Sequence, residues 1–344
     1  MSHKNIDEAR KSIFKESASV DDRTVVRGFS VDEPFELERF LASFATNGFQ
    51  ATNLGLGIDI LKRMRHARDA QGQGFVLFLG YTSNQVSSGN RELIRYLVQH
   101  KMVDALVTTA GGVEEDIIKC LHPFVIGDFR APGKALREQG INRTGNIFVP
   151  NDRYIAFEQF LRPMLDELTH KNTKSVTITP SEFIKLLGER IASHENAKDS
   201  IAYWAAKHNI PIFCAALTDG SIGDITFFHQ YNLLAKGEQK LSIDILADNA
   251  KLNRLAIDAK QTGALIIGSG LVKHQILNAN MMREGLDYAV YLNTSAEYDG
   301  SDSGAEPEEA KSWGKVGADA NTVKIVCDAT IALPLLVLGA FRKK

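Results

Sequence analysis

Cysteine is scarce in this sequence, with three in 344 residues. Cys120, Cys214 and Cys327 are odd in number, far apart and not arranged as CxxC. This pattern argues against a disulfide framework and against a zinc site, and we predict no metal site of any kind. Dispersed cysteines of this sort are typical of a protein that works in a reducing compartment.

Long apolar runs are also absent. The longest, Ala329–Phe341, is too short to span a bilayer and contains Pro334. The N-terminus, MSHKNIDEARKSIFKES, lacks the apolar core of a secretory signal peptide. We therefore expect a cytoplasmic protein.

Neither sign of charge dominates the composition. Lys and Arg number 40 against 42 Asp and Glu, which gives a net charge of −2. No basic domain or stripe stands out, so nucleic acid is not an expected partner. The hydrophobic content of 44% and charged content of 24% are those of an ordinary globular protein with a substantial core.

Residues 1–34 are polar and charged, with a weak apolar pattern at Ile6, Ile13 and Phe14. The pattern predicts one short helix in an N-terminal arm, and a frayed terminus is the alternative. Helical patterns recur later, and the string Thr179-Pro180-Ser181-Glu182 combines a capping box with proline at the first helical position. The other predicted helices are 35–44, 54–64, 91–100, 154–168 and 249–260.

Nine apolar segments predict β-strands, and helical patterns lie between most of them. This alternation favours an α/β fold: a doubly wound, mostly parallel, Rossmann-like sheet with helices on both faces. No Gly/Ser linker or break in composition divides residues 35–344, so we predict a single domain there. The predicted strands are 75–79, 105–109, 146–149, 175–178, 211–215, 242–246, 264–267, 288–292 and 323–326.

Several predicted strands end in loops rich in small or acidic residues, where open α/β sheets bind ligands. These loops favour a composite dinucleotide site. The usual fingerprint is incomplete, because residues 268–273 match only the first two glycines of GxGxxG and Lys273 stands in place of the third. Ordinary turn glycines therefore remain an open alternative.

The most unusual stretch is 293–317, NTSAEYDGSDSGAEPEEAKSWGKVG. A solvated acidic loop is one interpretation. The glycines and Trp313 favour another, a pocket for a cation with a flat aromatic wall. Up to Ala310 the stretch contains no Lys or Arg, and its carboxylates are Glu297, Asp299, Asp302, Glu306, Glu308 and Glu309.

Lys315 closes this stretch. Pro307 is placed to start a short helix and Gly314 to end it, which puts Lys315 at a helix end beside Trp313. A lysine there can bind the last helix carbonyls. It can also act as a nucleophile that forms a Schiff base, which requires a desolvated, neutral amine. Spacing alone leaves both roles open.

The string EYDGSDSGAEPEEAKSWGK, residues 297–315, closely resembles the active-site signature of deoxyhypusine synthases. The resemblance extends from about Val26 to the C-terminus. Five further blocks occur in the same order as in that family: FLGYTSNQVSSG (78–89), LVTTAGGVEED (106–116), ALTDGSIGD (216–224), GSGLVKHQILNANMMREGLDYAVYLNT (268–294) and CDATIALPLL (327–336).

The resemblance implies a bound NAD in a non-classical site. At Ser269 the sequence departs from the family, where glycine is common. The implied cofactor residues are Ser83, Asn84, Ser87, Thr109, Ala110, Gly111, Glu115, Asp219, Ser269, Thr294, Ser295, Asp328 and Ala329.

The resemblance also implies a spermidine site. Spaced carboxylates suit a ligand with three positive amines, and an indole suits its methylenes and its charge. His274 is implied as a catalytic residue that takes a proton from the amine, although an ordinary helix histidine is the alternative. The implied substrate residues are Glu114, Glu115, Asp224, His274, Gly300, Ser301, Asp302, Glu309 and Trp313.

The implied reaction is an aminobutyl transfer. NAD oxidises spermidine, Lys315 takes the aminobutyl group as an imine, and a lysine of the precursor of the hypusine-bearing translation factor receives it. The family further implies a homotetramer with sites between chains, and an N-terminal arm that covers a neighbour's site. Alternatives are a homospermidine synthase with a free polyamine acceptor, a regulatory paralogue, and a sirtuin-like protein, which leaves the acidic stretch unexplained.

Overall fold

The computed structural model describes residues 3–170, 176–237 and 240–343. Its central sheet has six strands, each parallel to its neighbours, in the order β11-β10-β9-β1-β2-β7. Because side chains alternate along a strand, Leu77 and Leu79 face one apolar core while Val76 and Phe78 face another. The strands are β1 (Phe75–Tyr81), β2 (Ala105–Thr108), β7 (Ile212–Phe213), β9 (Gln261–Ile267), β10 (Leu286–Asn293) and β11 (Val316–Val326).

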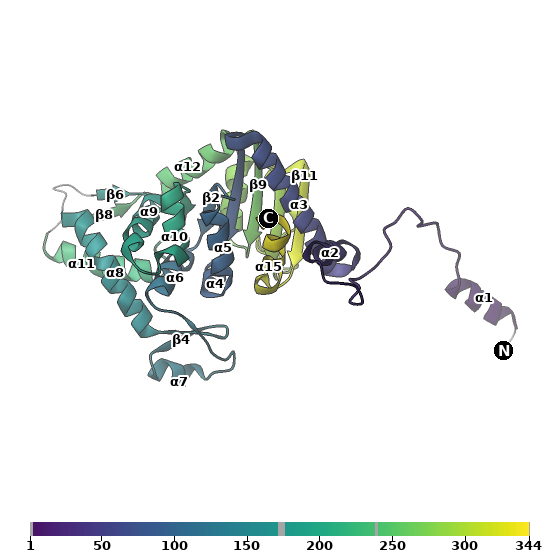
Figure 1. The fold of residues 1–344 in the computed structure, drawn as a ribbon, viewed down its shortest axis with the longest axis horizontal. Coiled ribbons are helices and arrows are strands. Elements are labelled where there is room, and N and C mark those ends of the chain that lie inside the picture. Colours follow the sequence, from purple (N-terminus) through teal and green to yellow (C-terminus); the bar gives the residue numbers. More distant parts are fainter. Residues whose placement is uncertain (1–2, 171–175, 238–239, 344) are drawn as a thin grey trace.

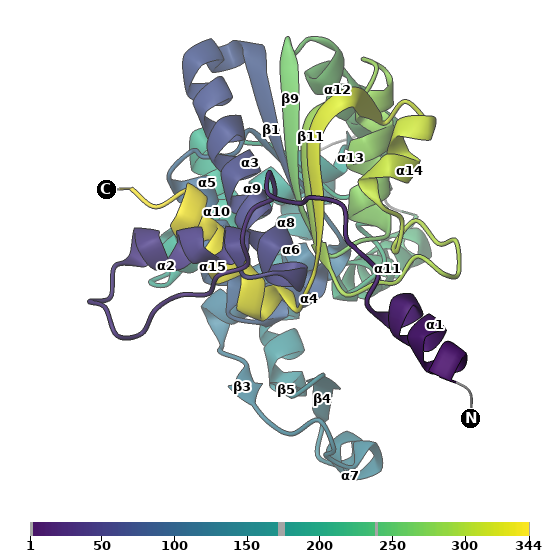
Figure 2. The ribbon, with the colours of Figure 1, turned by 90° about the vertical axis from the view of Figure 1, so that its right-hand side faces the viewer.

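Helices cover both faces of this sheet (Figure 2). The arrangement confirms the doubly wound α/β fold, because each face of a buried parallel sheet needs an apolar cover. One face carries α3 (Phe49–Gln71), α4 (Ser83–Ser87), α5 (Asn90–Gln99), α6 (Ala110–Leu121) and α15 (Ala329–Ala340). The other carries α12 (Ile245–Ile257), α13 (Leu271–Met281) and α14 (Pro307–Ser312).

Three of the predicted strands do not join the central sheet, which corrects the expectation of one continuous sheet. Gly145, at φ +59°, turns the chain into a hairpin, so β5 pairs antiparallel with β3 and β4. The other two form a separate parallel pair, β6 with β8, and residue 175 lies outside the described residues. The strands are β3 (Val125–Ile126), β4 (Ile141–Thr144), β5 (Ile147–Pro150), β6 (Val176–Ile178) and β8 (Leu241–Ile243).

The remaining helices extend the molecule beyond the β7 edge of the sheet (Figure 1). The capping box predicted at Thr179 is confirmed, since its side chain accepts from the Glu182 amide and Glu182 accepts from the Thr179 amide. No helix of the described chain is long and apolar enough to cross a membrane. These helices are α7 (Gly133–Glu138), α8 (Asn151–His170), α9 (Pro180–Arg190), α10 (Ile201–His208) and α11 (Ser221–Ala235).

Residues 3–26 leave the body of the molecule as an extended segment that carries α1 (His3–Ile13) at its far end (Figure 1). The Arg27 amide donates to the Thr46 carbonyl, and the Phe29 ring packs on Phe40. The apolar side chains Ile6, Ile13 and Phe14 are all exposed. The chain then enters the fold through α2 (Leu37–Ser43), whose Leu41 is buried. One short helix was predicted in this segment, and α1 confirms it.

Candidate functional site

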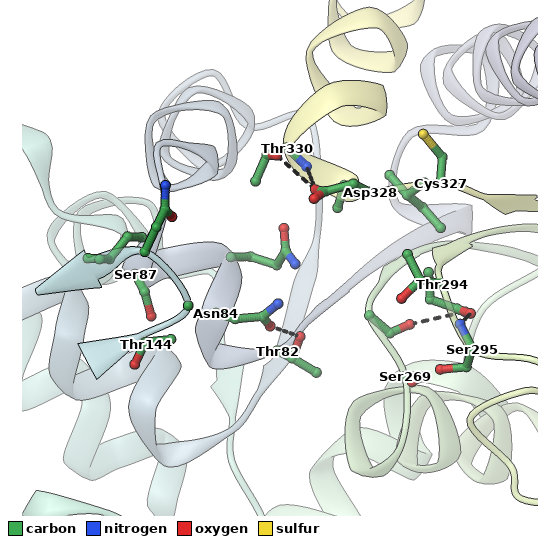
Figure 3. A pocket seen from close by; sticks show the side chains of 18 residues that line it. Thr82, Asn84, Ser87, Thr144, Ser269, Thr294, Ser295, Cys327, Asp328 and Thr330 are labelled. Carbon is green, nitrogen blue, oxygen red and sulfur yellow. Dashed lines mark hydrogen bonds between the residues drawn. The ribbon is translucent and has the colours of Figure 1, made fainter. Parts of the chain in front are cut away.

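A cavity of about 560 Å³ lies at the carboxyl end of the central strands. Figure 3 shows its polar side chains facing one another across an open space. Loops after β1, β9, β10 and β11 form most of the wall, as expected for the carboxyl edge of a parallel sheet. The lining residues named in the figure are Thr82, Asn84, Ser87, Thr144, Ser269, Thr294, Ser295, Cys327, Asp328 and Thr330.

Seven of the predicted cofactor residues line this cavity: Asn84, Ser87, Ser269, Thr294, Ser295, Asp328 and Ala329. Most of the others adjoin it. The Ser83 amide donates to Thr109 Oγ1 at 3.2 Å, Ala110 follows Thr109 at the start of α6, and a Cβ on Gly111 would lie 2.7 Å from Ser83 Cβ. Asp219 is not among the lining residues; it is exposed in the loop before α11.

Local hydrogen bonds hold the cavity wall in place. Asp328 caps α15, accepting from the Thr330 amide at 2.7 Å and the Thr330 hydroxyl at 2.8 Å. The Ser295 amide donates to Asn293 Oδ1 at 3.0 Å. Gly268 adopts φ +92°, and a Cβ there would lie 2.4 Å from Thr82 Oγ1. The wall therefore needs glycine at position 268 for both conformation and space.

The turn between β4 and β5 also lines the cavity, through residues 144–147. None of these residues was predicted to belong to a site. Gly145 and its neighbours Thr144 and Asn146 signal a tight turn, but such a signal says nothing about which cavity the turn reaches. Only the hairpin of β4 and β5 brings them to the site (Figure 3).

Glu114 and Glu115 link the cavity to a second one on α6 and α11. The Ser87 hydroxyl donates to Glu115 Oε2, and burial raises the pKa of Glu115 to about 7. Burial also raises the pKa of Glu114, which accepts from the Ile222 amide at 2.9 Å. Glu114 lines a neighbouring cavity of about 550 Å³ together with Asp224. Three predicted substrate carboxylates therefore lie on this side.

The other predicted substrate residues lie on α13, α14 and the loop between β10 and α14. His274 Nδ1 is 3.5 Å from Asp302 Oδ1, and Gly300 and Ser301 precede Asp302 in the same loop. Glu309 lies on α14, exposed. The predicted start of this helix at Pro307 is confirmed, and Gly314 follows its end at φ +67°.

Lys315 is 9% exposed, and its Nζ lies 5.4 Å from the centre of the Trp313 ring. Its amide, not its side chain, donates to the α14 carbonyl of Ala310, at 3.0 Å. Within residues 3–170, 176–237 and 240–343, Lys315 forms no ion pair, and Nζ donates no hydrogen bond. Trp313 itself is 63% exposed.

Within a single chain, Lys315 lies far from the cavity. Lys315 directly precedes β11, whose first residue, Val316, pairs with Leu286; Val326, at the other end, pairs with Asn293 at the cavity. Seven residue steps along β10 separate the two ends, roughly 20 Å. The helix α11, which carries Asp224, lies on the other side of the body of the molecule from β11, which Lys315 precedes (Figure 1). The predicted site residues thus form separate groups.

Comparison with known proteins gives a consistent result. A family profile described as deoxyhypusine synthase matches residues 39–340. Deoxyhypusine synthase from Musa acuminata is 47% identical over 362 residues, covering 98% of this chain and 94% of the relative. That from Caenorhabditis elegans is 45% identical over 365 residues, covering 99% and 96%.

A solved structure agrees with these relatives. A crystal structure from Entamoeba histolytica that carries a provisional deoxyhypusine synthase name is 30% identical, with a TM-score of 0.66. The match covers 92% of this chain and 96% of that chain. The chain belongs to the deoxyhypusine synthase family of transferases.

Proposed function

We propose that the chain moves the aminobutyl group of spermidine, through an imine on Lys315, to a lysine of the precursor of the hypusine-bearing translation factor. NAD serves as the cofactor, and the reaction takes place in the cytoplasm. Deoxyhypusine is the product on the acceptor lysine. The names of the relatives support this acceptor over a free polyamine.

The cavity at the carboxyl edge fits a dinucleotide in size and in chemistry. About 560 Å³ lies within the range of cofactor sites, and the wall offers hydroxyl and amide groups of Asn84, Ser87, Ser269 and Thr294. The Asp328 carboxylate suits a ribose hydroxyl. When bound, NAD takes up a hydride in the first half of the reaction and returns it in the second.

The carboxylates and His274 suit spermidine. Asp302 lies 3.5 Å from His274 Nδ1, so it orients the imidazole and leaves Nε2 to take the proton released as an amine is oxidised. Asp224 and Glu309 are exposed and form no ion pair within the described residues, so both are free to bind ammonium groups.

The observation that carries the proposal is the environment of Lys315. This amine is buried against Trp313, and no carboxylate of the described chain lies within ion-pair distance of it. Because Nζ forms no ion pair and donates no hydrogen bond within the described chain, it is available to attack an imine carbon. Lys315 Nζ then attacks the oxidised carbon, 1,3-diaminopropane leaves, and the imine passes to the acceptor lysine, where hydride reduces it to a secondary amine.

The separation of Lys315 from the cavity and from Asp224 supports sites that are shared between chains. A second copy supplies Lys315, Trp313 and Glu309 to the cavity and the Asp224 side of the first, within a homotetramer. A two-fold axis makes two such sites at each interface, because each chain gives the same two surfaces.

Trapping the imine tests the proposal. The protein is incubated with NAD and spermidine, reduced with borohydride, digested and mapped by mass spectrometry. We expect an aminobutyl adduct on Lys315. Lys315→Arg retains positive charge but forms no adduct, because a guanidinium stays protonated and does not attack. Adding the precursor protein, or putrescine in its place, then identifies the acceptor.

Lys311 provides the matched control. It lies on the same helix and pairs with Glu308 at 2.9 Å. Lys311→Arg keeps that ion pair and is expected to form the Lys315 adduct at the wild-type rate. An adduct on Lys311, or full activity in Lys315→Arg, contradicts the assignment.

A further inference from the structure

Two buried lysines from other elements donate hydrogen bonds to the loop between β10 and α14, residues 294–306. We call this segment the acidic loop, since it carries Glu297, Asp299, Asp302 and Glu306 and no Lys or Arg. Mutual repulsion among these carboxylates opposes a compact conformation. The conformation that the loop adopts therefore needs support from outside its own sequence.

Lys273, on α13, supplies one support. It is 1% exposed, and its Nζ donates to the carbonyls of Asp302 at 2.5 Å and Ala305 at 2.8 Å. The same ammonium lies 4.9 Å from the centre of the Tyr291 ring. Burial lowers the pKa of Lys273, whereas the charge of Asp302 raises it. Two carbonyls and an aromatic face replace the water that this cation loses.

Lys324, on β11, supplies the second support. It is 4% exposed; its Nζ donates to the Gly304 carbonyl and lies 3.2 Å from Glu306 Oε1. Together the two lysines bind three carbonyls within four residues of the loop. Neither lysine lines any of the cavities described above. Their hydrogen bonds to the loop are made with its backbone carbonyls.

The position of the loop backbone also determines where the proposed substrate-binding side chains lie. Lys273 and His274 are adjacent on α13, and they contact the two ends of one residue: Lys273 binds the Asp302 carbonyl, and His274 faces its carboxylate at 3.5 Å. Beyond Ala305 and Glu306 the chain enters α14, which leads to Lys315. A shift of the loop backbone would therefore move Asp302 and the start of α14 together.

We propose that Lys273 and Lys324 are positioning residues that hold the acidic loop in its polyamine-binding conformation while its carboxylates have no bound polycation. The proposal rests on the proposed function for the identity of the ligand. The lysines act through the loop backbone and make no contact with the polyamine. Their charge keeps a cluster of carboxylates in place before the substrate's own charge arrives.

Charge and positioning make opposite predictions for loss of either lysine. Lys273→Met and Lys324→Met keep a similar length and remove one positive charge near the polyamine site. Through space, that loss strengthens the binding of a polycation. If the lysines position the loop, the loss weakens binding, because two loop carbonyls lose their charged donor in Lys273→Met and one does in Lys324→Met. The sign of the change in spermidine affinity separates the two effects.

The experiment measures binding of spermidine and of NAD by calorimetry to the wild-type protein and to each variant. For Lys273→Met and Lys324→Met we expect the spermidine Kd to rise at least about tenfold, the cost of a charged hydrogen bond, with the NAD Kd unchanged. Lys311→Met is the matched control: it removes a charge from α14 that binds no loop carbonyl, and its spermidine Kd should stay equal or fall.

The outcomes are distinct. Tighter or unchanged spermidine binding in both buried-lysine variants overturns the positioning role. Parallel loss of NAD and spermidine binding also overturns it, because that pattern indicates a general loss of folded structure. Failure of the wild-type protein to bind spermidine contradicts the proposed function instead, so the two failures are distinguishable.

Discussion

Glu114 and Glu115 are adjacent on α6, but the fold gives their buried carboxylates different hydrogen-bond partners. Glu114 accepts a hydrogen bond from the Ile222 backbone amide at the start of α11, whereas Glu115 has the Ser87 hydroxyl as its hydrogen-bond partner. Both have a raised pKa, and burial is the largest cause in each case. Glu114 and Glu115 are therefore poorly hydrated beside the cavity, and the burial of their charged forms is a cost to the free energy of unfolding.

That cost depends on pH. The pKa of Glu115 rises from 4.5 to about 7 on folding, so its burial costs nothing below pH 4.5 and the full amount above pH 7. We expect Glu115→Gln to raise the free energy of unfolding at pH 8, by on the order of 3 kcal/mol, and to change it little at pH 4.5. Urea unfolding at both pH values, at one protein concentration, measures this. A variant that is less stable than wild type at pH 8 contradicts the expectation.

Asp224 and Glu309 should bind the polyamine and not the cofactor, because only the polyamine needs their charge. For Asp224→Asn and Glu309→Gln we expect the spermidine Kd to rise about tenfold to a hundredfold, the cost of one charged hydrogen bond. The NAD Kd should stay at the wild-type value. Calorimetric titration with each ligand checks this, and equal weakening of both would refute the assignment.

At the scale of elements, α3 protects the open edge of the central sheet. Asn53 donates to the Lys324 carbonyl at 3.0 Å, and Gln50 accepts from the Val326 amide at 2.8 Å. Such side chains occupy backbone groups that another strand would otherwise pair with. The Lys324 carbonyl and the Val326 amide are therefore not free to pair with a strand of another chain.

The other notable element is α1, which lies outside the body of the molecule with its apolar side chains exposed. The weak amphipathic pattern and the family resemblance motivate an arm that closes a neighbouring chain's site. Deleting residues 1–20 is expected to leave the Tm and the oligomeric state unchanged and to lower turnover. Thermal unfolding, light scattering and steady-state kinetics test this. Undiminished turnover in a stable truncated oligomer would remove the proposed role.

At the scale of the whole molecule, the distribution of site residues predicts complementation. Lys315→Arg and Asp224→Asn chains are each expected to be impaired at limiting spermidine. If each site takes Lys315 from one chain and Asp224 from another, a mixed dimer has one intact site. Random mixing then restores about a quarter of the wild-type turnover, since half of the dimers are mixed.

Co-expression of the two variants with different tags isolates the mixed species for assay. The matched control is a chain that carries both substitutions, co-expressed with wild type. Every site of that mixed dimer contains one of the two substitutions, so the mixed dimer has no intact site. Turnover of the mixed variants that never exceeds that of either variant alone would show that sites do not form between chains in this way.

Much of the local structure follows from the sequence by itself. The cores of the central strands, the capping box at Thr179 and the bounds of α14 between Pro307 and Gly314 were all predictable. Each depends on residues within one or two turns of one another, where apolar period and capping chemistry act directly. The family was also identifiable, because ordered blocks of residues carry it.

Tertiary structure decided the rest. It assigned β5, β6 and β8 to sheets separate from the central one, and it brought the turn at Gly145 to the cavity at the carboxyl edge of the central sheet. It also separated Lys315 from that cavity and buried Lys273 and Lys324 beneath the acidic loop. These outcomes depend on contacts between residues far apart in the chain. Local propensity carries no record of which distant segment a strand end or a lysine will meet, and only packing of the whole chain selects that partner.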